Sequence, residues 1–246
     1  MRILCLFLII TSNLVAQSTN ELFSRASVCY ENMEYDSALV HYKSIESTPV
    51  FSSDLYYNMA NCYYKKQQTA LAVLYFEKAL KLKPNDEDIQ FNLKLVQLQL
   101  VDRLAVIPTP FYTKWMTQLK LIFSIDQWAK IGLLFFFLFS FGISWFLISS
   151  NYLLKKKLFS SFVFSLILSF TAMAMAYYSF GTQKNTAILM SANAYVKSAP
   201  SLQSEDLFIL HEGTKVEVVE EFNNWTKIKL SDGMIGWLEN ELIAPI

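Results

Sequence analysis

A pattern of small and aromatic residues occurs twice in the first third of the chain, with a shift of 34 positions. The first copy comprises Ala26, Tyr30, Ala38, Val40 and Tyr42. The second copy comprises Ala60, Tyr64, Ala72, Leu74 and Phe76. A repeat of this length predicts pairs of antiparallel helices that stack side by side, because a single pair cannot bury its apolar face alone. The pattern therefore restricts this region to an all-helical stack.

Within each expected pair, the small residues mark where two helices cross closely, and the aromatic residue continues the apolar face. We expect repeats over residues 19–52 and 53–86. Pro84 closes the second repeat, and Asp86 is placed to cap the next helix. That helix has one apolar stripe and no second helix after it, so residues 87–104 are predicted to be a capping half-repeat. The period of 34 is that of tetratricopeptide repeats, which bind other polypeptides.

The concave groove of a tetratricopeptide stack is lined by side chains of the first helix of each pair. By register, these are Phe23, Ser27 and Tyr30 in the first repeat, Asp54, Tyr57, Asn61, Tyr64 and Lys65 in the second, and Asp88 and Phe91 in the cap. Aromatic rings with an amide and mixed charge can hold an extended peptide. The alternative is that some of these rings pack between repeats. The two-carboxylate clamp of some chaperone-binding repeats is excluded, because it needs Lys and Asn where this chain has Phe23 and Ser27.

Composition and the first residues point to a membrane. Hydrophobic residues make up 53% of the chain and charged residues 17%, which is typical of membrane proteins. Arg2 and the apolar run Ile3–Ile10 predict a signal peptide over residues 1–16, with an uncleaved amphipathic anchor as the alternative. The chain has 21 basic and 21 acidic residues, so we expect no nucleic-acid partner.

Two uncharged stretches, Ile131–Leu154 and Leu158–Gln183, are each long enough to cross about 30 Å of hydrocarbon. They predict a hairpin of transmembrane helices over 128–154 and 158–183. Ser124 and Gln127 have the spacing of a capping box, which would start the first helix near Ile125. The preceding linker, 105–127, is expected to contain an interfacial helix. Small residues at Gly132, Ser140, Gly142 and Ser144 would let the two helices approach each other.

Lys155, Lys156 and Lys157 lie between the two stretches and predict a cytoplasmic turn at 155–157. Both soluble ends would then be periplasmic, at a bacterial inner membrane. The export signal predicts the same orientation.

The last segment, 185–246, changes from a helical period to alternation of apolar and polar residues. Short strands are expected at 187–190, 195–197, 207–210, 215–221, 225–230 and 236–238, which suggests a small antiparallel barrel. Gly213, Gly233 and Gly236 are placed where a tight barrel needs positive φ or close backbone approach. The expected fold class is therefore multidomain: all-α tetratricopeptide repeats, a two-helix transmembrane hairpin and a small all-β barrel.

This tail resembles a bacterial SH3 domain of the SH3b or SH3_3 type. The similar segments are Leu210–Val216, Trp225–Ile228 and Asp232–Leu238, the last with the pattern Asp-Gly-x-x-Gly-Trp. Related domains bind cell-wall peptides or protein tails, which makes Tyr195, Trp225 and Trp237 candidate surface residues. The favoured interpretation for the two tryptophans is that they pack in the core of the barrel.

The order of signal peptide, repeats, two spanning helices and SH3-like tail resembles the BatE family of the Bacteroides aerotolerance (Bat) operon. The resemblance implies a scaffold that binds Bat proteins with von Willebrand A domains, associated with a MoxR-type AAA+ ATPase and a stress response. Because that ATPase is cytoplasmic, its contact would be indirect. The alternative is an envelope-binding module whose tail binds peptidoglycan.

Residues of catalytic or metal-binding type are sparse. Cys29 and Cys62 could form a disulfide in an exported region, but their register favours buried, inert thiols. His41 and His211 are expected to face solvent, with no ligand cluster around them. No phosphate loop, nucleophile elbow or carboxylate pair with defined spacing is present, so we expect no enzyme activity, no metal and no cofactor.

Overall fold

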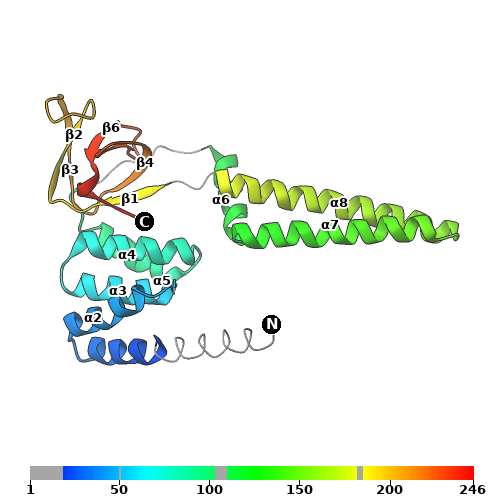
Figure 1. Cartoon of the computed structure of the whole chain (residues 1–246), viewed down its shortest axis with the longest axis horizontal. Helices are drawn as coiled ribbons and strands as arrows, with labels where there is room; N and C mark the ends of the chain where they lie inside the picture. The colour runs from blue at the N-terminus through cyan, green and yellow to red at the C-terminus, as the bar shows by residue number, and fades with distance from the viewer. Residues whose placement is uncertain (1–18, 50, 103–109, 182–184) are drawn as a thin grey trace, which may run out of the picture. The chain divides into compact units, whose positions relative to one another are not determined.

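The computed structural model describes residues 19–49, 51–102, 110–181 and 185–246. The expected signal peptide and part of the linker lie outside these residues. The described chain divides into two compact units (Figure 1). One contains the helices before residue 103 together with the strands after residue 184, and the other contains the long helical hairpin between them.

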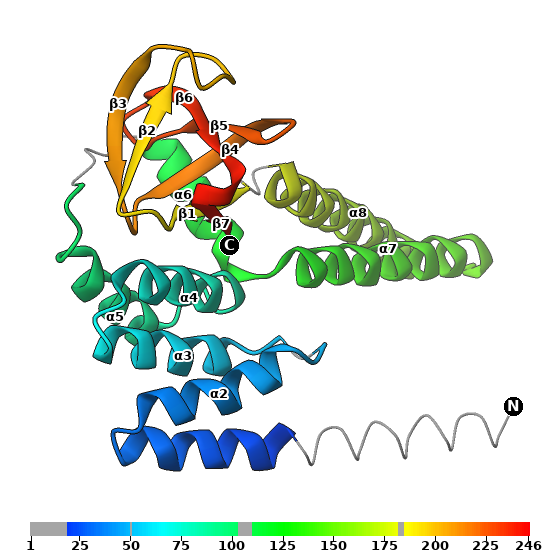
Figure 2. The ribbon, with the colours of Figure 1, turned by 60° about the vertical axis from the view of Figure 1, so that its left-hand side comes forward.

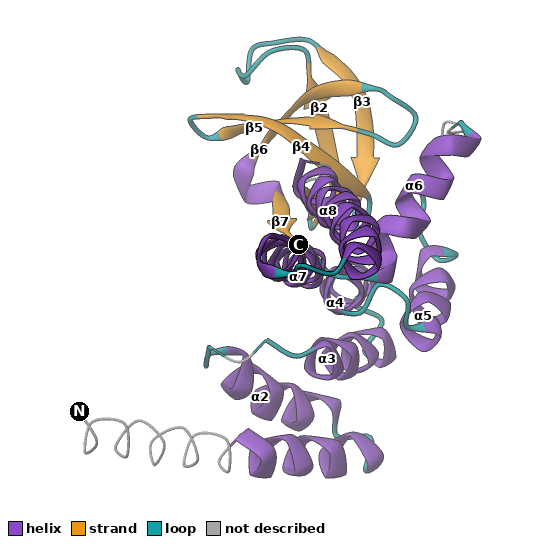
Figure 3. Cartoon of the chain, turned by 90° about the vertical axis from the view of Figure 1, so that its right-hand side faces the viewer, coloured by secondary structure: helices purple, strands orange, loops and turns teal. Residues whose placement is uncertain are grey.

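The first unit begins with a stack of paired helices, which Figure 3 shows in purple. A helix over residues 19–31 pairs with α2 (Tyr35–Glu46), and α3 (Ser53–Lys65) pairs with α4 (Thr69–Leu82). The unpaired α5 (Glu87–Gln97) follows, and Asp86 caps it by accepting a hydrogen bond from the Ile89 N–H. Ala26, Ala38, Ala60 and Ala72 are fully buried where the helices cross. The period of 34 is thus confirmed as a repeat of helix pairs.

The 34-residue repeat also extends to the backbone of the turns. Met33 and Gln67 both have positive φ, at 63° and 60°. The next residues, Glu34 and Gln68, donate backbone hydrogen bonds to the carbonyls of residues five positions earlier, Cys29 and Tyr63. This is the Schellman ending of a helix, which usually has glycine at the positive-φ position. Both repeats thus use the same turn, although neither has a glycine there.

The second unit consists of α6 (Phe111–Ile122), α7 (Ile125–Ile148) and α8 (Tyr152–Gly181). The expected capping box is present: Gln127 N–H donates to the Ser124 hydroxyl, and the Gln127 side chain accepts from the Ser124 N–H. At about 1.5 Å per residue, the 24 residues of α7 and 30 residues of α8 are long enough to cross a membrane, and both are predominantly apolar.

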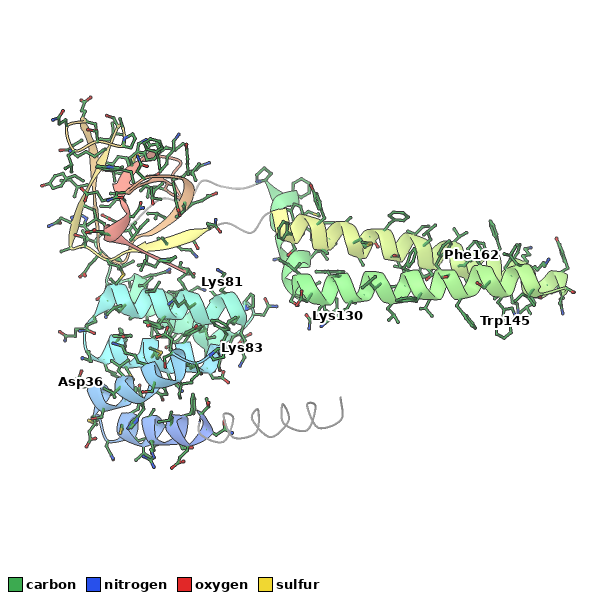
Figure 4. The ribbon with its side chains drawn as sticks, in the orientation of Figure 1. Asp36, Lys81, Lys83, Lys130, Trp145 and Phe162 are labelled. Carbon is green, nitrogen blue, oxygen red and sulfur yellow. The ribbon has the colours of Figure 1, made fainter. Side chains whose placement is uncertain are left out.

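The two long helices approach closely through small residues. A Cβ atom added to Gly132 would lie 2.9 Å from Met173 Cγ, and one added to Gly142 would lie 2.9 Å from Phe162 Cβ. The Ser169 hydroxyl donates across the hairpin to the Gly132 carbonyl, at 2.9 Å. The expected role of the two glycines is confirmed, whereas Ser140 and Ser144 are exposed and the Ser144 hydroxyl donates to the Ser140 carbonyl of the same helix. Phe162 and the outward-facing Trp145 are labelled in Figure 4.

The bend of this hairpin differs from the sequence prediction. It lies at residues 149–151, between the end of α7 and the start of α8, and not at 155–157. Lys155, Lys156 and Lys157 are helical residues near the start of α8. Asn151 explains the earlier start, because its side chain accepts the backbone N–H of Leu153, as a helix-capping residue does.

The tail is a seven-stranded antiparallel sheet in the order β3-β2-β6-β5-β4-β1-β7. Figure 2 shows β2, β3 and β6 side by side. The strands are β1 (Thr186–Leu189), β2 (Asn193–Lys197), β3 (Asp206–His211), β4 (Lys215–Phe222), β5 (Trp225–Lys229), β6 (Ile235–Glu239) and β7 (Ile243–Pro245), with a 3-10 turn at Asn240–Leu242 before β7. The sequence patterns predicted the first six strands and missed β7, which is only three residues long.

The expected small barrel is corrected to an open sheet. Within the described residues, the edge strands β3 and β7 each pair with one neighbour and not with each other. Gly213 and Gly233 have positive φ in turns, at 83° and 94°, as expected. Gly236 provides close backbone approach: a Cβ there would overlap Val196 Cγ1.

The tail packs on the end of the repeats through β1 and β7. Ile188 of β1 is fully buried and belongs to the same apolar core as the repeats, which Met190, Ala244 and Ile246 also contact. Lys81 of α4, labelled in Figure 4, donates to the Ile246 carbonyl at 2.7 Å. The sequence predicted two separate soluble domains, whereas the structure joins them in one compact unit.

Candidate binding surfaces of the repeats and the tail

The predicted groove residues form two classes by exposure. Phe23, Ser27, Tyr30, Tyr57, Asn61 and Tyr64 are half-buried, while Asp54, Lys65, Asp88 and Phe91 are exposed. The half-buried class contains every predicted tyrosine of the groove. Both interpretations of these aromatic residues therefore apply: part of each side chain packs between helices and part remains accessible.

The same contact between two aromatic rings packs the groove side chains in both repeats. The Phe23 ring meets the Tyr42 ring edge-on, with centroids 5.6 Å apart. The Tyr57 ring meets the Phe76 ring in the same way, with centroids 5.9 Å apart. Tyr42 and Phe76 are both nearly fully buried, so they hold their partners in place from the core. The groove aromatics therefore keep their orientation without a ligand, which lowers the entropy lost on binding.

The hydroxyl groups of two groove tyrosines connect α3 to α5 and to the residues just after it. The Asn92 amide donates to the Tyr57 hydroxyl at 2.7 Å, and the Gln99 amide donates to the Tyr64 hydroxyl at 3.4 Å. These bonds show that the first-helix faces of the second repeat and the cap are adjacent. Asn92 and Gln99 were not predicted from the sequence, because an isolated amide has no periodic signal.

The groove also has an apolar end that the sequence analysis left out. Leu95 and Leu98 lie 34 positions after Asn61 and Tyr64, and together with Phe91 they form an exposed stripe on α5. The exposed fractions of Phe91, Leu95 and Leu98 are 62%, 38% and 68%. The register used for the other groove residues would have found both leucines. The groove thus changes from tyrosine and amide on α3 to aliphatic and phenyl groups on α5.

Charge along this face is partly compensated within the chain. Asp54 pairs with Lys83, whose Nζ lies 2.7 Å from the Asp54 carboxylate, and this contact raises the pKa of Lys83. Lys65 and Lys94 are exposed and have no ion pair within the described residues. Helical spacing places both lysines beside the groove, since Lys65 lies four positions after Asn61 and Lys94 lies three positions after Phe91. A carboxylate of a partner would find its complementary charge here.

The tail surface lies on the side of the sheet opposite its core. Ile228 and Leu238 are fully buried, whereas Trp225 and Trp237 are half-exposed and point to the other side of β5 and β6. The favoured interpretation that the tryptophans fill the core is therefore wrong. Side chains of a strand alternate between faces, so Trp225 and Ile228 must lie on opposite sides. Tyr195 is 55% exposed on β2.

One row of side chains crosses the tail surface at Trp237. Strand pairing places Trp237 between Lys197 of β2 and Lys227 of β5. Lys227 Nζ lies 5.6 Å from the centroid of the Trp237 ring, and Lys197 pairs with Asp206 at 2.7 Å. Lys227 thus covers part of the aromatic ring and leaves less of it free for a ligand.

The remaining candidates have structural roles. Cys29 and Cys62 are both free, and burial raises the pKa of the Cys62 thiol to about 12, so this thiol is inert near neutral pH. His41 is half-buried, and His211 is not simply solvent-facing as expected, because its Nδ1 lies 2.7 Å from the Asp102 carboxylate. Among the described residues, His, Cys, Asp and Glu form no group that could hold a metal ion.

Comparison with known families assigns two segments of the chain. Residues 53–86 match the tetratricopeptide repeat, and residues 192–244 match the bacterial SH3 domain. The chain carries a tetratricopeptide repeat and a bacterial SH3 domain. A search of curated proteins finds no match to this chain. Both kinds of module are typically non-catalytic, and their combination suggests binding to proteins or to the cell wall.

Proposed function

We propose that this protein is a membrane-anchored scaffold that binds partner proteins through the groove of its repeats, with the SH3 domain as a second contact surface. The observation that carries the proposal is the continuous face of α3 and α5, on which Tyr57 and Tyr64 are held by core packing and amide bonds. Preordered aromatic side chains that remain partly accessible are typical of protein-binding surfaces.

The groove chemistry defines the kind of segment that would fit. The aliphatic end, Phe91, Leu95 and Leu98, favours bulky apolar side chains on the partner. Lys65 and Lys94 favour a carboxylate beside them. We therefore expect a partner segment that combines apolar side chains with an acidic residue.

The orientation proposed here is periplasmic for both soluble parts, with the two apolar helices in a bacterial inner membrane. Two features support it. The first unit is assembled from sequence on both sides of the helical hairpin, so its two halves must be in the same compartment. The three lysines lie near the bend, at the opposite end of α8 from the SH3 domain, which favours a cytoplasmic bend.

The proposed partners follow from the resemblance to the BatE family. Bat proteins with von Willebrand A domains are the direct partners we propose, within a complex for aerotolerance or stress that includes a MoxR-type AAA+ ATPase. Because only the bend of the hairpin would reach the cytoplasm, the ATPase would be linked through other subunits.

The test is affinity capture of the tagged full-length protein from detergent-solubilised membranes. The wild type is compared with the triple variant Tyr57→Ala, Asn61→Ala and Tyr64→Ala. A matched control carries Val40→Ala and Ser44→Ala, two exposed positions on α2, which is a second helix of a pair. We expect the groove variant to lose von Willebrand A proteins and the control to retain them.

Because the alanine variant also removes core contacts of Tyr57, a second variant uses exposed positions only. Lys65→Glu with Phe91→Ser changes the charge and the apolar end of the groove without removing a buried side chain. Capture that survives both groove variants would overturn the scaffold function.

A second candidate function is binding of peptidoglycan by the tail. The exposed Tyr195 and the half-exposed Trp225 and Trp237 favour it, since aromatic side chains on an open sheet can stack on a ligand. Lys227 over the Trp237 ring counts against it. Co-sedimentation of the full-length protein with purified peptidoglycan, lost on Tyr195→Ala, would favour this second function.

A further inference from the structure

The repeats end in a way that leaves an apolar face to be covered. In each complete repeat the first helix is followed by a second helix, which covers the apolar face of the first. Helix α5 has no such helix after it, yet Ile89, Leu93 and Val96 are buried. Leu100, just after α5, is also partly buried against the core of the repeats.

The tail contributes to the cover at this end. Ile188 of β1 is fully buried in the core of the repeats, and Leu100 lies directly over Gly213, in the turn between β3 and β4. A side chain at Gly213 would overlap Leu100. The exposed end of a solenoid normally needs a capping element with a polar outer face. Here β1 packs on α4, the last second helix of the stack, so the edge of the sheet, β1 with β7, meets that requirement.

Besides the Lys81–Ile246 hydrogen bond, two groups of polar contacts join the surfaces. Lys215 of β4 pairs with Glu77 of α4 at 2.6 Å, and the Glu77 side chain is only 8% exposed. The Asp102 carboxylate accepts three hydrogen bonds: from the His211 backbone N–H at 2.7 Å, from the His211 ring at 2.7 Å and from the Thr214 hydroxyl at 2.8 Å. Asp102 thus satisfies a backbone donor of the edge strand β3 and holds the turn that packs on Leu100.

We propose that the SH3 domain, together with the half-repeat 87–104, caps the repeat stack. Asp102 and the Glu77–Lys215 pair hold it there, so that repeats and tail fold and open as one body. The groove and the tail surface are consequently presented to partners in one fixed arrangement. This inference does not depend on the identity of any partner.

The experiment is hydrogen exchange, followed by mass spectrometry, on the full-length protein in detergent micelles. The variants are Asp102→Asn and Glu77→Gln, which keep the shape of the side chain and remove its charge. Asp54→Asn is the matched control, because Asp54 also pairs with a lysine at 2.7 Å but lies away from the tail. The readouts are the amides of α4 and of β1, which contact each other across the interface.

We expect either interface variant to raise exchange in both α4 and β1 by about 10-fold, and the control to change neither. A larger effect is not expected for Glu77→Gln, because the Lys215 side chain is 42% exposed and solvent screens the pair. Increased exchange on the mutated side alone would overturn the proposal. Unrelated exchange rates of the α4 and β1 amides in the wild type would also overturn it, because elements that open as one body must exchange at similar rates. That measurement does not depend on any variant folding correctly.

Discussion

Substituting Gly236 by alanine tests how closely the strands of the tail approach each other. Gly236 lies on β6 and its backbone faces β2. A Cβ atom there would overlap Val196 Cγ1 and would lie 3.1 Å from the Lys197 carbonyl oxygen. The valine could turn, but the carbonyl oxygen belongs to the paired backbone of β2 and cannot move without shifting the strand. We therefore expect the two strands to separate.

The loss in free energy of unfolding follows from the size of this overlap. Overpacking a dense core by one methyl group costs about 1–3 kcal/mol, and we expect about 2 kcal/mol here because one of the two close atoms is backbone. At roughly 0.05–0.15 kcal/mol per residue, a domain the length of the tail has only about 3–9 kcal/mol of stability. Gly236→Ala should therefore remove a substantial fraction of it.

Hydrogen exchange of the full-length protein measures this loss directly. Since about 1.4 kcal/mol corresponds to a factor of 10, amides of β2 and β6 should exchange about 30-fold faster in the variant. Gly181→Ala is the matched control, because a Cβ at Gly181 would meet no atom within 4 Å. Unchanged exchange in β6, or an equal effect of both substitutions on the tail, would refute the reasoning.

Three further predictions concern the repeats and their junction with the tail. Gln67→Gly should stabilise the repeats by about 1 kcal/mol, seen as slower exchange of α3 amides, because Gln67 has a φ of 60° that favours glycine; faster exchange would contradict this. Cys62 should react with a maleimide at pH 7 far more slowly than Cys29, because burial raises its thiol pKa to about 12; equal rates would argue against a closed core. Burial would raise the pKa of Asp102, but its hydrogen bonds from His211 and Thr214 outweigh burial and lower that pKa below 3.8. An acidic group with a depressed pKa stabilises the folded state at pH values above its unfolded pKa, and this stabilisation is lost as the pH falls through its folded pKa. The thermal stability of the wild type should therefore fall below about pH 4, and Asp102→Asn should lack this pH-dependent component.

The parts of the fold that follow from local patterns were predicted well. The 34-residue period identified the helix pairs, since Ala26 and Ala60 mark crossing points that only small residues permit. Ser124 and Gln127 identified the start of α7, because a capping box is contained within four residues. Alternation identified the strands, and the same alternation places Trp225 on the outer face once Ile228 is assigned to the core.

The residues of the candidate site that follow from the repeat register were also predictable. Register along the repeats found Tyr57 and Tyr64 and would have found Leu95 and Leu98, because each first helix presents the same positions to the groove. It could not find Asn92, whose amide meets the Tyr57 hydroxyl through the packing of one helix on another. The lysines near the bend were recognised, but the bend itself was misplaced because helix length is set by capping at Asn151 and not by charge.

The amino-acid sequence by itself thus determined the secondary-structure elements: paired helices, two long apolar helices and short alternating strands. Each of these follows from a pattern of residues that lie close together in the chain. Tertiary structure alone decided that the tail packs on the repeats. That contact joins Asp102 to His211, which are 109 positions apart, and buries Ile188 in a core made by residues before 101. Complementarity between two distant surfaces has no period along the chain, because it depends on how whole elements fit together and not on the order of adjacent residues.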